Sequence, residues 1–486
     1  MEIKDYLAKI EGVIAKGPYK DTWESLSNYP VPKWYREAKF GIFIHWGVYA
    51  VPAFGSEWYP RQMYLKGAPE YEHHIKTYGE HDKFGYKDFI PMFRGEKFDA
   101  AAWMKLFRDA GAKYVMPVAE HHDGFKMYKS GLSKWNAAEM GPCRDIVGEL
   151  KAEADKLGLK LCCSNHRAEH FWFFSGGLEY PSDVKGAGYD DFYGPPHPAP
   201  SDLGSLTDCP PTEEHMNDWL AANCELADRY RPAVVWFDWW IQQLAWKPYL
   251  RKFAAYYYNR AAEWGEEVAV NNKFDSFLYT STVFDIERGQ LAGVLPRLWQ
   301  NDTAIAKNSW GYTHNNDFKK ASGLAADLAD IISKNGCLLL NVGPRADGSI
   351  TEEETGVLLD MGSWLKTNGE AVYGSSPWRV YGEGPTEIPA GEFSDTNRAP
   401  FTSEDIRFTT NNGFLYAFVL KSPKDGEVNI KSLGAAARLL TTAIKRITVL
   451  GSGDYVNFHL GADSLRAHIA NPINTEFPIC LKVELY

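Results

Sequence analysis

Short apolar runs that end in polar or aromatic residues recur up to about residue 350 and constrain the fold of this chain most. The runs have the length and composition of strands that are buried on both faces: residues 40–44, 114–118, 159–164, 233–236, 268–270 and 337–340. Helical patterns lie between them. Asp99, for example, can cap a helix that carries Trp103 and Phe107 on one face and stops at Gly111. Strands and helices that alternate at this spacing predict a parallel α/β sheet.

The side chains at the strand ends favour a closed barrel over an open sheet. The carboxyl ends of all strands of a (β/α)8 barrel converge on one mouth. A doubly wound sheet is the alternative, but no Gly-x-Gly-x-x-Gly follows a strand. We therefore predict a TIM-like barrel with these side chains around a common pocket: His45, His121, His122, His166, Asp238 and Lys273.

The pattern changes after about residue 371. Residues 408–418 read as two strands joined by an Asn-Asn-Gly turn, and residues 446–450 and 479–485 continue in the same style. We predict an antiparallel β-sandwich, and hence a barrel domain at residues 1–371 and a sandwich domain at residues 372–486. Residues 176–211 are rich in Gly, Pro and Asp and are expected to form a long irregular insertion.

Composition excludes some classes of partner. The net charge of -11 argues against nucleic-acid binding, and no apolar run approaches the length of a membrane span. The first residues alternate charged and apolar side chains, unlike a signal peptide. The seven cysteines contain no Cys-x-x-Cys pair, which predicts reduced thiols, no zinc site and a cytoplasmic location.

Asp238 is the first candidate for chemistry. It stands in residues 233–240, Ala-Val-Val-Trp-Phe-Asp-Trp-Trp, directly after an apolar strand. Burying an unpaired charge costs several kcal/mol, so this acid either has a partner or is kept for a reaction. A helix cap is the structural alternative for Asp238, and a core position is the alternative for the pocket role of Trp236 and its neighbours.

Metal chemistry and serine chemistry are both disfavoured. Adjacent residues of a strand point to opposite faces, so His121 and His122 cannot easily bind one ion, and no Gly-x-Ser-x-Gly is present. Neutral imidazoles beside a polyhydroxylated ligand fit better. Carboxylate-pair chemistry remains, although a Glu next to an Arg is often only a surface pair. The candidate partners of Asp238 are Glu57, Glu120, Glu169 and Glu287.

Several motifs together resemble the retaining α-L-fucosidases of glycoside hydrolase family 29. They run in order from about residue 34 to residue 350: Lys-Phe-Gly-Ile-Phe-Ile-His-Trp-Gly (39–47), Ser-Glu-Trp-Tyr (56–59), His-His-Asp-Gly-Phe (121–125), Val-Trp-Phe-Asp (235–238), Asp-Ile-Glu-Arg-Gly (285–289), Trp-Gln-Asn-Asp-Thr (299–303), Ser-Trp-Gly-Tyr (309–312) and Leu-Leu-Asn-Val-Gly-Pro (339–344). The resemblance implies a distorted barrel followed by a β-sandwich, and the release of L-fucose from a fucosylated oligosaccharide or glycoconjugate.

The resemblance also implies residue roles. Asp238 matches the nucleophile of a double displacement, and Glu287 is the implied acid/base. The chain differs from many relatives at Gln300, where they have Glu, at Lys273, where they have Arg, and at His166, where they have an aromatic residue. No metal or organic cofactor is implied. The implied substrate contacts are His45, Trp46, Glu57, Trp58, His121, His122, His166, Trp236, Lys273 and Trp310.

Two other functions fit the same residues. A retaining glycosidase for a related sugar, such as a galactoside, would share the carboxylates, and a non-catalytic sugar-binding protein would keep the tryptophans and histidines. We expect residues 176–211 to set the preference for the leaving group. The sequence does not indicate an oligomeric state.

Overall fold

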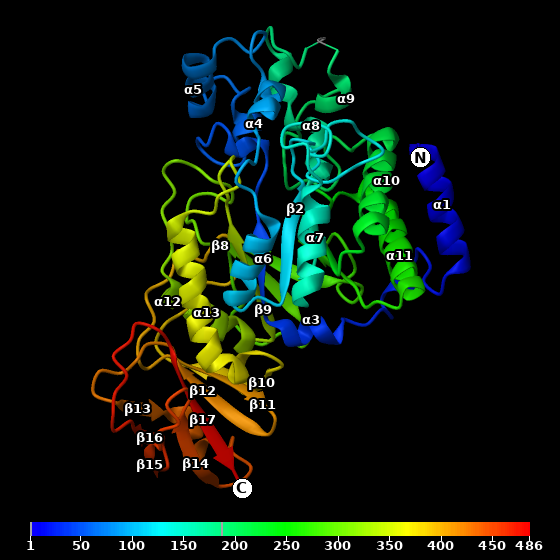
Figure 1. Ribbon diagram of the computed structural model, residues 1–486. Coiled ribbons are helices and arrows are strands. Elements are labelled where there is room, and N and C mark those ends of the chain that lie inside the picture. Colours follow the sequence, from blue (N-terminus) through cyan, green and yellow to red (C-terminus); the bar gives the residue numbers. More distant parts are fainter. Residues whose placement is uncertain (1, 186–187) are drawn as a thin grey trace.

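The computed structural model describes residues 2–185 and 188–486, and its larger part is a closed parallel barrel (Figure 1). Every strand pair in the ring is parallel, and β1 pairs with both β2 and β9, which closes it. This closure rules out the open doubly wound sheet. The strands are β1 (Phe40–Ile44), β2 (Tyr114–Glu120), β3 (Lys160–Leu161), β4 (Cys163–Asn165), β5 (Val234–Phe237), β6 (Ala269–Asn272), β7 (Val283–Glu287), β8 (Trp299–Ala304) and β9 (Gly336–Val342).

Helices cover the outside of the barrel (Figure 1). The predicted caps form: the Asp99 carboxylate accepts from Ala102 N at 3.0 Å at the start of α6, and Gly158 takes φ 69° after α7. The described chain from β6 through β7 to β8 contains no helix, which makes the barrel distorted. The helices are α1 (Ile3–Lys16), α2 (Trp23–Leu26), α3 (Lys33–Ala38), α4 (Tyr59–Gln62), α5 (Pro69–Tyr78), α6 (Ala100–Asp109), α7 (Ile146–Leu157), α8 (His170–Phe173), α9 (Asp190–Tyr193), α10 (Glu213–Tyr230), α11 (Lys247–Trp264), α12 (Ala321–Ser333) and α13 (Glu352–Val372).

The barrel is filled by side chains. One buried cluster joins Phe43 on β1, Met116 on β2, Trp236 on β5 and Leu339 on β9, as expected for the layers inside such a barrel. Alternate strand residues therefore point into the barrel. This alternation also determines which side chain at each strand end points into the mouth of the barrel.

The remaining strands form two antiparallel sheets that pack on each other. The predicted hairpin is present, with Asn412 and Gly413 both at positive φ in its turn. A shared core joins Phe408 and Leu415 of one sheet to Val428 and Leu465 of the other, which confirms the predicted sandwich. The strands are β10 (Ser376–Glu383), β11 (Ile406–Asn411), β12 (Phe414–Val419), β13 (Glu427–Ile430), β14 (Ile444–Val449), β15 (Asn457–Leu460), β16 (Leu465–His468) and β17 (Ile479–Leu485).

The segment between β10 and β11 returns to the barrel. Gly391 N donates to Gln290 O at 3.1 Å, and Phe393 N donates to Glu287 O at 2.9 Å. This part of the chain therefore lies next to the end of β7. Among the described residues, no helix is both long and apolar enough to cross a membrane, and all seven cysteines are free thiols.

Candidate active site

A pocket of about 430 Å³ lies at the carboxyl ends of the barrel strands. It collects residues from the ends of β1, β2, β4, β5, β6 and β7, as the strand-end rule predicts. A larger cleft of about 1310 Å³ beside α12 contains none of the predicted site residues. The smaller pocket is lined by His45, Glu57, Trp58, His121, His122, His166, Trp236, Asp238, Trp239, Lys273, Phe274, Glu287, Asp302, Trp310, Glu392 and Phe393.

Asp238 lies directly after β5 and is almost completely enclosed by hydrogen-bond donors. Its Oδ1 accepts from Lys273 Nζ at 2.9 Å and from Trp239 N at 2.8 Å. Its Oδ2 lies 2.8 Å from His166 Nδ1. A buried carboxylate with this many donors is held in one orientation and is stabilised in its ionised form.

Lys273 connects Asp238 to Glu287. Its Nζ forms ion pairs with both carboxylates and lies 4.5 Å from the centre of the Trp236 ring. The second oxygen of Glu287 accepts from Trp310 Nε1 at 3.2 Å. Two oxygens that contact one ammonium nitrogen can be no more than about 6 Å apart, which brings the carboxylates close to each other.

The two carboxylates differ in their affinity for protons. Burial alone would raise the pKa of Asp238, but the positive charge of Lys273 and the contact with His166 hold this pKa well below its ordinary value. The pKa of Glu287 is raised, mainly by burial and also by the charge of Asp238, although Lys273 opposes the shift. One carboxylate is thus kept ionised and the other tends to hold a proton, the division expected of a nucleophile and an acid.

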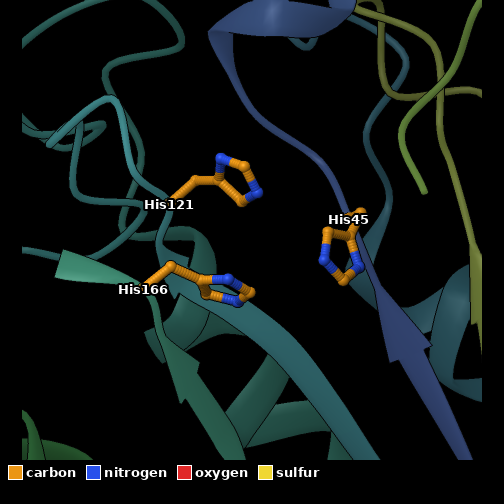
Figure 2. Close-up of side chains that lie close together, drawn as sticks. All are labelled: His45, His121 and His166. Carbon is orange, nitrogen blue, oxygen red and sulfur yellow. The ribbon is translucent and has the colours of Figure 1, made fainter. Parts of the chain in front are cut away.

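Three imidazoles face a common space from three different strands (Figure 2). Asn341 fixes the orientation of His45: its amide nitrogen donates to Trp310 O at 2.7 Å, so its oxygen faces His45 Nδ1, also at 2.7 Å. His45 Nδ1 therefore carries the hydrogen, and Nε2 offers a lone pair to the pocket. Burial lowers the pKa of both His45 and His121 well below the ordinary value, so both rings are neutral.

The same imidazoles could hold a metal ion. Ring nitrogens of His45, His121 and His166 lie within 4.8 Å of one another, and three histidines are the ligand set of some catalytic zinc sites. His122 belongs to a second group, with Nε2 3.4 Å from Asp238 Oδ2. The premise that His121 and His122 point to opposite faces is wrong: both follow the end of β2, both line the pocket, and their ring centres lie 4.3 Å apart. Hydroxyl groups of a sugar suit the same nitrogens.

Glu57 supports the pocket wall. Its Oε2 accepts from Ser309 Oγ at 3.0 Å, Trp310 N at 2.8 Å and Gly311 N at 3.2 Å. Glu57 therefore positions Trp310, whose indole N–H donates to Glu287. The ring of Trp58 lies 5.1 Å from that of His122 and adds an apolar surface.

The structure corrects the assignment of Trp46. This residue is buried in the core against Phe93, Phe98 and Trp103, and its Nε1 donates to Arg345 O at 2.8 Å. The physical reason is alternation: because His45 points into the barrel mouth, the next side chain points away from it. Trp46 supports the strand end and does not line the pocket.

Two of the four candidate glutamates lie outside the pocket. Glu120 is buried in ion pairs with Lys126 and Arg167, and Glu169 is buried behind His122, with its Oε2 3.5 Å from His122 Nδ1. The described residues of segment 176–211 do not line the pocket either, and residues 186–187 lie outside the described chain.

Four pocket residues were not predicted from the sequence. Asp302 lies inside β8, buried beside Asp285, and burial together with that neighbour raises its pKa well above the ordinary value. Its acidic side chain within the Trp-Gln-Asn-Asp motif was the available signal. Nothing in the sequence connects residues 392–393 with this site, because they are separated from it by the whole of α12 and α13. The four are Phe274, Asp302, Glu392 and Phe393, whereas Trp239 is one of the neighbours of Trp236 for which the sequence indicated a pocket role.

Comparisons with known proteins identify the family of this chain. The sequence model described as Alpha-L-fucosidase matches residues 6–370. The chain belongs to the α-L-fucosidase family. Among relatives, tissue alpha-L-fucosidase of Rattus norvegicus is 31% identical over 456 residues, covering 90% of this chain and 86% of the relative. Alpha-L-fucosidase of Branchiostoma floridae is 32% identical over 457 residues, covering 90% of each.

Solved structures of the family share the fold. The alpha-fucosidase of Thermotoga maritima in complex with fucose is 29% identical with a TM-score of 0.76, covering 96% of this chain and all of that chain (100%). The resemblance to family 29 and the predicted barrel with a β-sandwich are both confirmed. As a member of this family, the chain is a glycoside hydrolase with α-L-fucosidase activity.

Proposed function

We propose that this chain hydrolyses α-L-fucosides with retention of configuration, with Asp238 as nucleophile and Glu287 as acid/base. The contact of Lys273 Nζ with both carboxylates carries the proposal. Because the two oxygens that contact this nitrogen are no more than about 6 Å apart, the contact supports the separation of about 5–5.5 Å that a retaining pair uses over the roughly 6.5–9.5 Å of an inverting pair.

The reaction has two displacements. Asp238 attacks the anomeric carbon, the bond to the leaving oxygen breaks, and Glu287 gives its proton to that oxygen. A fucosyl ester of Asp238 forms. Water then attacks the same carbon and gives a proton to Glu287, and the ester bond breaks to release fucose and the Asp238 carboxylate. The low pKa of Asp238 and the raised pKa of Glu287 suit these starting states.

The other pocket residues bind the sugar. The neutral imidazoles of His45, His121 and His122 offer one donor or acceptor each to ring hydroxyls. Trp58 and Trp236 present apolar surfaces to the C–H face and the methyl group of fucose. The substrate class is a fucosylated oligosaccharide or glycoconjugate.

Hydrolysis of an aryl α-L-fucoside tests the nucleophile. We expect Asp238→Ala to lower kcat by at least about 10³-fold, with azide restoring turnover and giving a β-fucosyl azide. Asp317→Ala, an exposed acid away from the pocket, is the matched control. Near wild-type turnover of Asp238→Ala would rule out the assignment.

Leaving groups of different acidity test the acid/base. Glu287→Ala should lose about 10²–10⁴-fold on poor leaving groups and far less on a good aryl leaving group. Glu392→Gln is the comparison, because Glu392 also lines the pocket. If Glu392→Gln shows this pattern and Glu287→Ala does not, Glu392 is the acid/base and Glu287 is not.

Two further measurements test the stereochemistry and the sugar. Proton NMR of the first product, with α-L-fucose expected, tests retention, and a panel of aryl glycosides tests the choice of sugar.

A further inference from the structure

Two phenylalanines stand exposed at the mouth of the pocket. Phe274 is 45% exposed and Phe393 is 59% exposed, although both line the cavity. Each has φ of 51°, a left-handed conformation that is unusual for a bulky residue. The fold thus holds two aromatic rings partly in water beside a sugar site, in backbone conformations that few sequences adopt.

Phe393 is fixed in place by the chain around Glu287. Its N–H donates to Glu287 O at 2.9 Å, and Ser394 N donates to Arg288 O at 2.7 Å. The side chain of Asp395 accepts from Thr303 Oγ1 at 2.6 Å and pairs with Lys319. Residues 391–395 are therefore attached to the end of β7 and to β8, and the Phe393 ring belongs to the wall of the site.

Phe274 is fixed in a similar way. It directly follows Lys273, and Ser276 Oγ donates to Lys273 O at 2.7 Å across the turn. Phe274 and Phe393 thus flank the ammonium and the carboxylate whose contact defines the reaction centre. Glu392 also lines the pocket and is half-buried, and burial raises its pKa to about 7.

The position of Glu287 decides which part of the substrate meets these rings. An acid/base protonates the leaving oxygen, so the leaving group departs on the side of Glu287. The rings fixed to the backbone around Glu287 and Lys273 are on this side, whereas the buried imidazoles receive the fucose ring. Whatever is attached to fucose must pass the two phenylalanines.

We propose that Phe274, Glu392 and Phe393, here called the aromatic rim, bind the leaving group and select for a pyranose sugar there. The inference rests on the proposed function. The two rings stack against the C–H face of the leaving sugar, and Glu392 hydrogen-bonds one of its hydroxyls. Leaving-group preference then resides at the rim, in place of segment 176–211.

Two alkyl fucosides separate the rim from the chemistry. Methyl α-L-fucoside and a fucosyl disaccharide with a hexopyranose leaving group both release an alkyl alcohol, but only the disaccharide reaches the rim. We expect Phe393→Ala and Phe274→Ala to lower kcat/KM for the disaccharide about 3- to 10-fold and to change it less than twofold for the methyl fucoside. Phe393→Leu keeps bulk without a flat ring, so its kcat/KM for the disaccharide should lie between those of the wild type and Phe393→Ala. Phe458→Ala, an exposed ring on β15, should change neither.

Equal losses of kcat/KM on both substrates, or no loss on either, would contradict the proposal that the aromatic rim binds the leaving group. Calorimetry in the Asp238→Ala background gives a readout that does not depend on turnover. There, Phe393→Ala should weaken binding of the disaccharide and leave binding of free L-fucose unchanged. Failure of the proposed function appears separately, as wild-type chain that hydrolyses neither fucoside while the binding difference persists.

Discussion

Lys273 is the residue on which the electrostatics of the site depend. Its charge lowers the pKa of both Asp238 and Glu287. We expect Lys273→Met to lower kcat/KM by roughly 10²–10³-fold, as the loss of a charge at a reaction centre does. Because Asp238 must be ionised and Glu287 protonated, removing the cation should move both limbs of the pH profile of kcat/KM to higher pH.

Lys273→Arg is the matched control for this prediction. It keeps the charge near both carboxylates and changes only the shape of the cation. The arginine variant should retain the wild-type limbs. Unchanged limbs in Lys273→Met would show that burial alone sets the two pKa values.

The cluster of His45, His121 and His166 predicts inhibition by zinc. Their ring nitrogens lie within 4.8 Å of one another, and the fixed Nδ1 contacts of His45 and His166 resemble the oxygen partners that orient zinc ligands. We expect Zn²⁺ to inhibit competitively with one ion per chain, reversed by EDTA. Calorimetry should show weaker binding by His121→Gln and unchanged binding by His314→Ala, an exposed histidine. Equal binding by both variants would contradict the prediction.

Individual residues were predictable from sequence where strand alternation fixed their direction. Asp238, His45 and His121 follow apolar strands and point into the mouth, as expected. The same alternation explains the error at Trp46. The contact of Lys273 with two carboxylates and the place of Phe393 in the pocket depend on tertiary contacts between segments that are distant in the sequence. A single sequence does not reveal such contacts.

At the scale of elements, apolar strands were predictable and polar strands were not. The runs behind β1, β5 and β9 are continuously apolar, and each is a strand in the structure. β8 is completely buried and β7 is largely buried, but the two strands contain Asp285, Gln300 and Asp302. Two of these polar groups pair with each other, since Gln300 Nε2 donates to Asp285 Oδ2 at 2.6 Å. A hydrophobicity pattern cannot reveal strands whose burial depends on such pairing.

The junction of β9 and α13 predicts a pH-dependent stability. Glu354, in the first turn of α13, is buried, and its Oε1 accepts from Gly343 N at 2.8 Å. Burial raises its pKa to about 7. Because this pKa exceeds the ordinary value, the proton stabilises the folded state fully below about pH 4.5, and this contribution is lost as the pH rises through 7.

Glu354→Gln should remove this dependence while keeping an oxygen for Gly343 N. We expect the variant to be more stable than the wild type at pH 8 by about 3 kcal/mol and similar at pH 4.5. Urea unfolding at the two pH values measures the difference. Exposed Glu353→Gln, the neighbouring residue, is the control, and parallel pH profiles for wild type and Glu354→Gln would contradict the assignment.

At the scale of the whole molecule, the barrel and the sandwich are not independent units. We propose residues 1–371 as the barrel domain and residues 372–486 as the sandwich domain, but their cores are continuous: one buried cluster includes Leu365 and Phe418 together. Arg407 of β11 also pairs with buried Asp330 of α12. The sandwich thus covers the barrel helices. The segment between its strands β10 and β11 also supplies Glu392 and Phe393 to the pocket.

A fragment of residues 1–372 should therefore fail to form a stable barrel. Removing the sandwich exposes Leu365 and Trp364, whose Nε1 otherwise donates to Pro478 O at 2.8 Å, and leaves Asp330 with Lys334 alone. We expect the fragment to aggregate or to melt well below the full chain, with loss of aryl fucoside hydrolysis. Arg407→Met in the full chain tests the same junction with one residue, and breaking a buried pair should cost roughly 3 kcal/mol. Calorimetric unfolding measures both, and a fragment that melts at the temperature of the full chain with full turnover would show that the barrel folds on its own.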